Sequence, residues 1–319
     1  MLTDLEKSII KTIAYFDVFN FPLTTLEIWK WLYRPREKYT LQQVREALEN
    51  SLELQSRLTL QEGFFSLKKR DSIYLLRKQN NNWAERKFQK TVRLVKIFRY
   101  LPFVRMIAVC NNLSYSNSRD SSDIDLFIIT KKNQIWLARF CCLLILKFLG
   151  LRPSVDNHRD KFCLSFFIDE AYLDMQGVML GQHDVHFVYW FSQFLPVYDP
   201  DNLFTKLRTA NSWYQEYLPN AYANEFINKV EPTFLSNLVA KVISVLSQLP
   251  IIAGWLYNRA RILQINIIDH NMRAMVNVDT RVIINEQMLK FHSNDRRDQY
   301  FHQWKDSVKE LLNSENNCD

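Results

Sequence analysis

Two aspartates separated by one apolar residue have the spacing best suited to chemistry in this chain. Asp123 and Asp125 flank Ile124, where a polar loop meets the apolar run from Leu126 to Thr130. Side chains alternate along a strand, so both carboxylates would lie on one face, about 7 Å apart along the strand. Two carboxylates this close repel each other unless a cation lies between them, and hard divalent cations prefer such oxygen ligands. The spacing therefore predicts a Mg²⁺ (or Mn²⁺) site at Asp123 and Asp125. The alternative is a pair of solvated acids at the start of a strand.

A small sheet is needed to hold this pair. Val104 to Cys110 is apolar and β-branched, which predicts a strand before the loop, and Leu126 to Thr130 predicts the strand after it. Gln134 to Phe148 predicts a buried helix, and Phe162 to Ile168 predicts a third strand. Helices and a hairpin come before this group and further helices follow it. The order predicts an α+β fold with a small mixed sheet.

The stretch around the aspartates resembles the nucleotidyltransferase superfamily typified by DNA polymerase β. That superfamily carries a Gly-Ser pair after its first strand and an Asp-x-Asp motif that opens the second. Ser122-Asp123-Ile124-Asp125-Leu126 matches the second half closely, whereas Asn111-Asn112 occupies the Gly-Ser positions. The rest of the chain resembles a bacterial group of proteins built around this domain, through the stretches Tyr15 to Thr24, Phe162 to Phe167 and Leu289 to Arg297.

The resemblance implies a nucleotidyltransferase-type sheet and a role for each matching residue. Asp123 and Asp125 would be catalytic and would hold the Mg²⁺ ions that grip a nucleoside triphosphate, the substrate. Asn111, Asn112 and Ser122 would contact the nucleotide. Asn at the first loop position adds a side chain where glycine lets backbone amides approach the phosphates, although Asn can adopt unusual backbone dihedrals.

Active members usually place a third carboxylate on a neighbouring strand. The middle of the third strand carries Ser165 and no acid, so the candidates are Asp169 and Glu170 at its end and Asp156 before it. We take Asp169 as the third catalytic residue. Arg139, in the helix after the central strands, either reaches the cleft as a nucleotide-binding residue or extends to the surface.

The N-terminal stretch, residues 1–80, predicts a winged helix-turn-helix domain. Three amphipathic segments, the second capped by Thr24 or Thr25 and the third by Thr40, precede two short strands around Gly63. The outward residues of the third helix would be Gln42, Gln43, Arg45, Glu46 and Glu49. Two acids against one arginine suit a phosphate backbone poorly, which makes sequence-specific DNA binding unlikely and favours a packing or substrate-docking module.

The net charge of +7 is concentrated in one part of the chain. Residues 68 to 105 hold 12 Lys and Arg and 2 acidic residues. The long helix predicted from Trp83 to Tyr100 would place Arg86, Lys90 and Arg93 on one face. This face is either solvated or borders the cleft and attracts a polyanion such as a nucleoside triphosphate or RNA.

Residues 81–222 would form the nucleotidyltransferase-like domain and residues 223–319 a C-terminal helical region. Leu235 to Tyr257 has apolar residues at helical spacing, which favours a buried amphipathic helix over a membrane-surface one. Near the end, we expect Ser293 or Asn294 to cap a final helix, with the charges of Asp295, Arg296 and Arg297 in solvent.

The five cysteines have no metal-site spacing and four lie in apolar surroundings, which is typical of reduced core residues in a cytoplasmic protein. The acidic start of the chain predicts no signal peptide, and Arg139 and Lys147 interrupt the most apolar stretch, so no membrane span is expected.

Three functions remain open from these residues. The first is Mg²⁺-dependent transfer of a nucleotidyl group to an acceptor hydroxyl on RNA, a protein or a small molecule. The second is a degenerate domain that keeps the fold and acts as a nucleotide-binding or scaffold protein. The third, a winged-helix regulator, ranks last because of its acidic reading helix.

Overall fold

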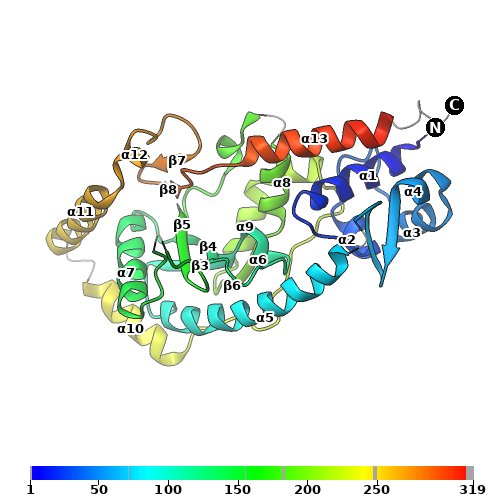
Figure 1. Cartoon of the computed structure of the whole chain (residues 1–319). Coiled ribbons are helices and arrows are strands. Elements are labelled where there is room, and N and C mark those ends of the chain that lie inside the picture. The colour runs from blue at the N-terminus through cyan, green and yellow to red at the C-terminus, as the bar shows by residue number, and fades with distance from the viewer. Residues whose placement is uncertain (1, 71, 155, 182–183, 247–249, 314–319) are drawn as a thin grey trace.

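The computed structural model describes residues 2–70, 72–154, 156–181, 184–246 and 250–313 (Figure 1). A six-stranded mixed sheet lies at its middle, in the order β6-β3-β4-β5-β8-β7. The strands are β3 (Val104–Val109), β4 (Ile124–Thr130), β5 (Phe162–Asp169), β6 (Leu195–Tyr198), β7 (Val282–Ile284) and β8 (Met288–Phe291). β4 and β5 are parallel, and the other neighbouring strands pair antiparallel. The mixed sheet and its three central strands are therefore confirmed.

Helices cover both faces of the sheet because the central strands are apolar on both sides. Ile107 and Ile128 pack with the apolar side chains of α5 (Ile73–Phe98) and α7 (Ile135–Phe148). Phe127 and Ile129 face the other way, toward α1 (Asp4–Asp17) and α8 (Val185–Ser192). Near-continuous apolar runs in β3 to β5 are what a strand buried on both faces requires.

Three strands of the sheet differ from the sequence-based expectation. The run from Val185 to Val197 is mostly apolar, and its lack of clear periodicity hid the point where α8 ends and β6 begins. β8 follows a turn within the region expected to be helical, and it pairs antiparallel with β5, with Phe167 opposite Leu289. β7 lies in the same C-terminal region and pairs antiparallel with β8. The C-terminal part of the chain thus completes the sheet.

The N-terminal part contains four helices and a hairpin: α1, α2 (Thr25–Lys30), α3 (Leu41–Asn50), α4 (Leu52–Arg57), β1 (Leu58–Gln61) and β2 (Phe64–Leu67). The expected caps of α2 and α3 are confirmed, since Thr24 and Thr40 each accept a hydrogen bond from a backbone N–H three residues later. Glu62 and Gly63 join the strands with φ of 53° and 81°, as a two-residue hairpin turn requires. α4, which precedes the hairpin, was not expected. The elements are those of the expected winged helix plus one helix, and whether the domain is of that type stays a prediction.

The remaining helices connect or flank these parts. They are α6 (Asn111–Ser114), the 3-10 turn Gln176–Val178, α9 (Leu203–Ala210), the 3-10 helix Ser212–Glu216, α10 (Phe234–Leu246), α11 (Pro250–Ile267), α12 (His270–Arg273) and α13 (Arg297–Asn313). α13 runs from the sheet back along α1 (Figure 1), and Trp304 donates its indole N–H to the carbonyl of Lys11 at 2.9 Å. The two ends of the chain therefore lie together.

The apolar residues of α10 are not buried as the sequence favoured. Leu235, Leu238 and Val242 are about half exposed, at 55, 48 and 52%. The predicted single helix is two helices, α10 and α11, at one end of the molecule (Figure 1). None of the helices within the described residues is long and apolar enough to cross a bilayer.

Replacement of Leu289 by alanine tests whether β8 belongs to the core of the sheet. Leu289 is fully buried, so Leu289→Ala should lower the free energy of unfolding by about 2–5 kcal/mol in chemical denaturation. The same substitution at Leu52, which is 79% exposed, should change it by less than about 0.5 kcal/mol. Equal effects of the two variants would contradict the placement of β8.

Candidate functional site

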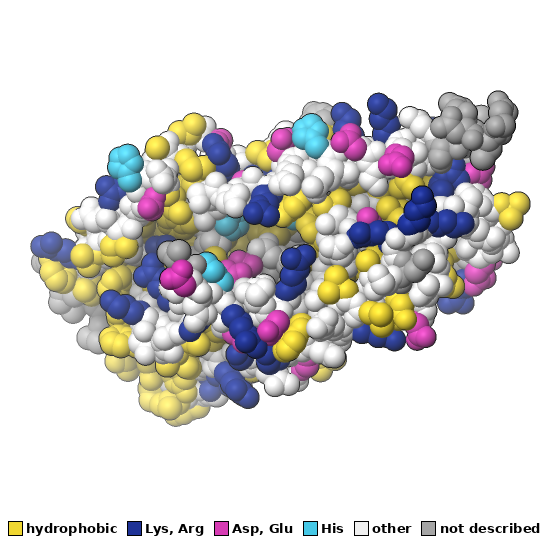
Figure 2. Space-filling model, in the orientation of Figure 1, with side chains coloured by type: hydrophobic (Ala, Val, Ile, Leu, Met, Phe, Trp, Pro, Cys, Tyr) yellow, Lys and Arg dark blue, Asp and Glu magenta, His cyan; other side chains and the backbone are white. Residues whose placement is uncertain are grey.

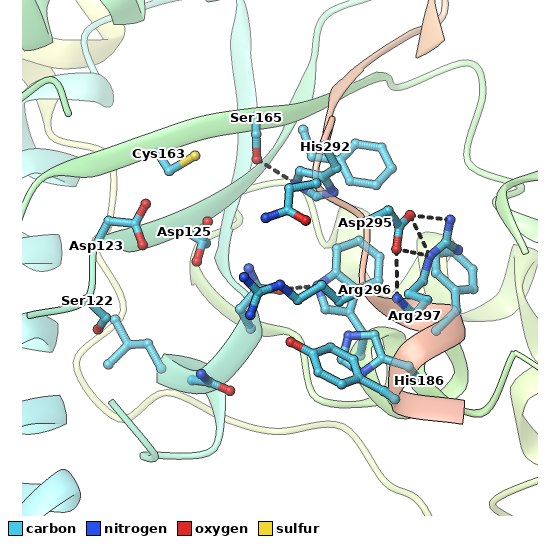
Figure 3. Close-up of a pocket in the computed structure, with 18 of the residues that line it drawn as sticks. Ser122, Asp123, Asp125, Cys163, Ser165, His186, His292, Asp295, Arg296 and Arg297 are labelled. Atoms are coloured by element: carbon cyan, nitrogen blue, oxygen red, sulfur yellow. Dashed lines mark hydrogen bonds and ion pairs between the residues drawn. The ribbon is translucent and has the colours of Figure 1, made fainter. Parts of the chain in front are cut away.

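The loop between β3 and β4 and the start of β4 bring the aspartates into a cavity of about 720 Å³. Ile124 is fully buried against the α5 side of the sheet, so Asp123 and Asp125 point to the opposite side, into the cavity (Figure 3). Figure 2 shows a hollow at the middle of the molecule, with acidic side chains and a histidine inside it. The expected same-face arrangement of the two carboxylates is confirmed.

Cys163 of β5 joins the two aspartates. β4 and β5 are parallel with Asp125 opposite Cys163, and a carboxylate oxygen of each aspartate and the Cys163 Sγ all lie within 4.8 Å of one another. Burial and the charges of the two aspartates raise the pKa of the Cys163 thiol, which favours its protonated form while no cation is bound. Two carboxylates without a thiolate suit Mg²⁺ or Mn²⁺ better than a soft metal.

The two carboxylates are held where a negative charge is costly. Burial raises the pKa of Asp123. Burial, and then the charge of Asp123, raise the pKa of Asp125 to about 7, although hydrogen bonds from Asn111 and Cys163 oppose the shift. At neutral pH the pair would therefore share a proton unless a cation lies beside it. A divalent cation would remove this repulsion, and Asp123 and Asp125 are the residues that would hold it.

The loop that takes the place of the superfamily's Gly-Ser pair lies beside the aspartates. Asn111 has a φ of 55°, a left-handed conformation that glycine adopts freely and asparagine more readily than most residues. Its side-chain oxygen accepts a hydrogen bond from the Trp190 indole N–H at 2.7 Å. Asn112 lines the cavity and accepts a hydrogen bond from the Tyr115 hydroxyl at 2.6 Å. Asn111 thus adopts a left-handed backbone conformation that is common for glycine, and Trp190 fixes its side chain by a hydrogen bond.

Ser122 also lines the cavity, directly before Asp123. Its hydroxyl donates to the carbonyl of Arg119 at 2.9 Å and lies 3.1 Å from the Ser118 hydroxyl. The structure therefore brings together Asn111, Asn112, Ser122, Asp123 and Asp125, as the sequence predicts.

Two other predicted site residues lie elsewhere. Asp169 is at the far end of β5, about 20 Å of strand from Cys163, where its carboxylate accepts backbone N–H bonds from Asn133 and Ala171. Arg139 is not among the residues that line the cavity: it donates to Gln264 of α11 at 2.8 Å, and its guanidinium lies over the ring of Phe291 in β8. Burial lowers the pKa of Arg139 to about 10. The structure does not bring either residue to the aspartates, and it gives Asp169 a loop-stabilising position.

The cations expected on the basic face of α5 differ in their surroundings: Arg93 is exposed, whereas Arg86 and Lys90 have an acidic partner within the protein. Arg86, Lys87 and Lys90 all contact the carboxylate of Asp160, at distances between 2.7 and 3.1 Å. Burial by itself raises the pKa of Asp160, but hydrogen bonds from Lys90 and Lys87 lower it to about 2. Arg86 also pairs with Asp120 at 2.8 Å, so each of the three cations has an acidic partner within the protein.

Lys87 connects this ion-pair cluster to the aspartate pair. Its side chain is fully buried, and its ammonium group donates to the backbone carbonyls of Asp120 and Ser122 as well as to Asp160. Asp160 in turn donates its backbone N–H to the Ser122 carbonyl at 3.2 Å. Lys87 thus fixes the backbone immediately before Asp123.

The turn between β8 and α13 forms the opposite wall of the cavity. The sequence predicted that the charged residues of this turn are in solvent. Asp295 and Arg297 are instead buried, each with 7% of its side chain exposed, and they form an ion pair at 2.8 Å. Asp295, rather than Ser293 or Asn294, accepts a hydrogen bond from the backbone N–H of Arg297. Arg297 also pairs with Asp184 at 2.7 Å, a partner 113 residues away that no local pattern could indicate. The resemblance of Leu289 to Arg297 to the bacterial group was the one signal for this wall.

Ser165 and His292 form a polar contact between the two walls. The Ser165 hydroxyl lies 2.7 Å from Nε2 of His292. Burial, followed by the neighbouring Lys290 charge, lowers the pKa of His292 to about 3, so the imidazole is neutral. The contact joins β5 to the turn after β8 at the edge of the cavity (Figure 3).

Comparison of the chain with protein-family models, with curated proteins and with solved structures finds no match. A functional assignment therefore depends on the chain's own residues.

The raised pKa of Asp125 predicts a pH-dependent stability. The folded protein binds the proton more tightly than the unfolded chain, so the free energy of unfolding should fall between about pH 4 and pH 7 in the presence of a chelator. Asp125→Asn removes the charge and should flatten this fall. At pH 8 the free energy of unfolding of the variant should exceed that of wild type by on the order of 2 kcal/mol. This is about half of the free energy that corresponds to the whole pKa shift of Asp125, because the carboxyl keeps some solvent contact. Parallel stability–pH curves would contradict the burial of this charge.

The role of Lys87 is testable on the same helix. Lys87→Met leaves Asp160 and two backbone carbonyls without their cation, so we expect it to lower the free energy of unfolding by about 3 kcal/mol. It should also speed proteolysis within residues 116–122. Lys96→Met, at an exposed position of α5, should leave both measurements within about 0.5 kcal/mol or twofold of wild type. A harmless Lys87→Met variant would show that the loop is held by other contacts.

Proposed function

We propose that the chain is a Mg²⁺- or Mn²⁺-dependent nucleotidyltransferase that uses a nucleoside triphosphate. The observation that supports this most is the pair of half-buried, same-face carboxylates at the start of β4, each with a raised pKa and with no ion pair to either among the described residues. The preceding loop supplies a left-handed residue, Asn111, where the superfamily has glycine. A cation-binding pair beside a tight polar loop in a cavity is the arrangement that this chemistry needs.

In the proposed reaction an acceptor hydroxyl forms a bond to the α-phosphorus, the bond from that phosphorus to the pyrophosphate oxygen breaks, and the hydroxyl proton passes to solvent water. Bound Mg²⁺ would lower the pKa of the hydroxyl and stabilise the leaving pyrophosphate. Asp123 and Asp125 would hold the cation. Lys87, through the backbone of Ser122, would keep Asp123 in register with Asp125.

A degenerate, nucleotide-binding or scaffold role is a second candidate, and one observation favours it. A protonated Cys163 stands opposite Asp125 on β5, the neighbouring strand on which a third carboxylate was expected. Asp295 also lines the cavity, but it is paired with Arg297 and Lys290. A protein of this kind would bind metal and triphosphate without turnover, because no free carboxylate would accept the hydroxyl proton.

Label transfer from each α-labelled nucleoside triphosphate, with Mg²⁺ or Mn²⁺, tests the enzyme proposal. Acceptors would be the protein itself, added RNA and a panel of small hydroxyl compounds. The double variant Asp123→Asn/Asp125→Asn should reduce transfer to below about 1% of wild type and abolish metal-dependent thermal stabilisation. Asp306→Asn, at an exposed position of α13, is the matched control and should behave as wild type.

The outcomes separate the candidates. Metal-dependent stabilisation by a triphosphate without transfer to any acceptor would favour the binding role. Neither stabilisation nor transfer in the wild-type protein would contradict both.

A further inference from the structure

The turn between β8 and α13 carries one arginine that the protein's own contacts do not use. Within the part of the chain that the structure describes, Lys290, Asp295 and Arg297 of this wall have charged partners, whereas the side chain of Arg296 has no hydrogen bond or ion pair. Arg296 is exposed to the cavity, and its side chain extends across it toward Asp125 (Figure 3). A guanidinium group on the wall opposite two carboxylates, and bound to neither, is available for a ligand.

The backbone that carries Arg296 is fixed on both sides. Arg297 donates to the Val178 carbonyl at 2.9 Å and to Asp184 at 2.7 Å, and both of these side-chain contacts are buried. Lys290 donates to the Thr280 carbonyl and lies 3.7 Å from Asp295, with 3% of its side chain exposed. The network holds the turn in place, so the ligand would not have to order the segment that presents Arg296.

Arg296 on one side of the cavity and the two aspartates on the other restrict the chemistry of a ligand that could bind between them. A guanidinium group binds planar or tetrahedral oxyanions, and phosphate is a preferred partner. An anion bound there alone would be repelled by Asp123 and Asp125, whereas an anion that brings a divalent cation would satisfy both walls at once. A phosphate chain that carries a metal has both features. The aromatic side chains of Phe19, Tyr115 and Tyr300 that line the same cavity offer faces for a base.

We propose that Arg296 binds the β- and γ-phosphates of a metal-bound nucleoside triphosphate and so makes the cavity select triphosphates over monophosphates. This inference rests on the proposed function, but it concerns a different wall of the site. Arg296 is a binding residue for the leaving pyrophosphate, and the aspartates hold the cation that the phosphates share.

Nucleotide affinity as a function of phosphate number tests the inference without turnover. Dissociation constants of ATP, ADP and AMP, and of the other three ribonucleotide series, would be measured by calorimetry with Mn²⁺ for wild type, Arg296→Gln and Arg296→Lys. Arg296→Gln should weaken triphosphate binding by about 10–100-fold and monophosphate binding by less than about twofold. Arg296→Lys, which keeps the charge but not the two-pronged geometry, should fall between.

Arg45→Gln, at an exposed position of α3, is the matched control and should bind all nucleotides as wild type does. Because the Arg296 side chain has no partner among the described residues, circular dichroism and thermal unfolding of Arg296→Gln should match wild type.

Equal triphosphate affinity in wild type and Arg296→Gln, or an equal loss for tri- and monophosphates, would overturn the inference and leave the proposed function standing. Tighter binding of Mn²⁺ alone in Arg296→Gln, with unchanged triphosphate affinity, would show that Arg296 is a counter-ion of the aspartates and would also overturn it. If wild type bound no nucleotide of any series, the proposed function would fail with it.

Discussion

The constraint on which the site depends is electrostatic repulsion between two half-buried carboxylates. Asp123 and Asp125 lie on one face of β4, with the protonated thiol of Cys163 within reach of both. Folding has to bring these groups together against the preference of each carboxylate for water. Such an arrangement lowers the stability of the protein alone and becomes favourable once a cation is bound. This is the reason to regard the pair as a binding site rather than as part of the core.

The surrounding contacts fix the two walls that face each other across the cavity. On one side, Lys87 is buried with Asp160 and holds the backbone before Asp123. On the other, Arg297 is buried between Asp184 and Asp295. Several cations near the cavity, such as Lys87 and Arg297, therefore have acidic partners in the same chain. What remains for a ligand is the aspartate pair, the asparagine loop and Arg296.

The sequence predicted the parts of the fold and the site that depend on local patterns. Alternation around Ile124 predicted the shared face of the aspartates, and threonines at helix starts predicted the caps at Thr24 and Thr40. β6 was missed because it follows the apolar helix α8 after only two residues, without a clear change of pattern, and β8 because its pairing with β5 joins segments more than 100 residues apart. Asp169 was assigned to the site because it is near in sequence, but a strand's length separates it from the pair.

The buried ion pairs of the turn between β8 and α13 could not be predicted from local sequence patterns for the same reason. Whether Asp295 and Arg297 are solvated or buried depends on Asp184, and only the folded chain brings these three residues together. The position of Arg139 depends likewise on α11, whose Gln264 accepts its hydrogen bond. Charged residues are the ones whose surroundings a sequence predicts least, because one distant partner decides between burial and exposure.

The most direct test of the cation site is the location of Mn²⁺ by anomalous scattering in crystals grown with a non-hydrolysable nucleoside triphosphate. The account predicts a Mn²⁺ peak with oxygen ligands from both Asp123 and Asp125, and phosphate oxygens completing its coordination. A well-ordered structure with no peak at this pair, or with Mn²⁺ bound elsewhere while both carboxyls stay protonated, would contradict it.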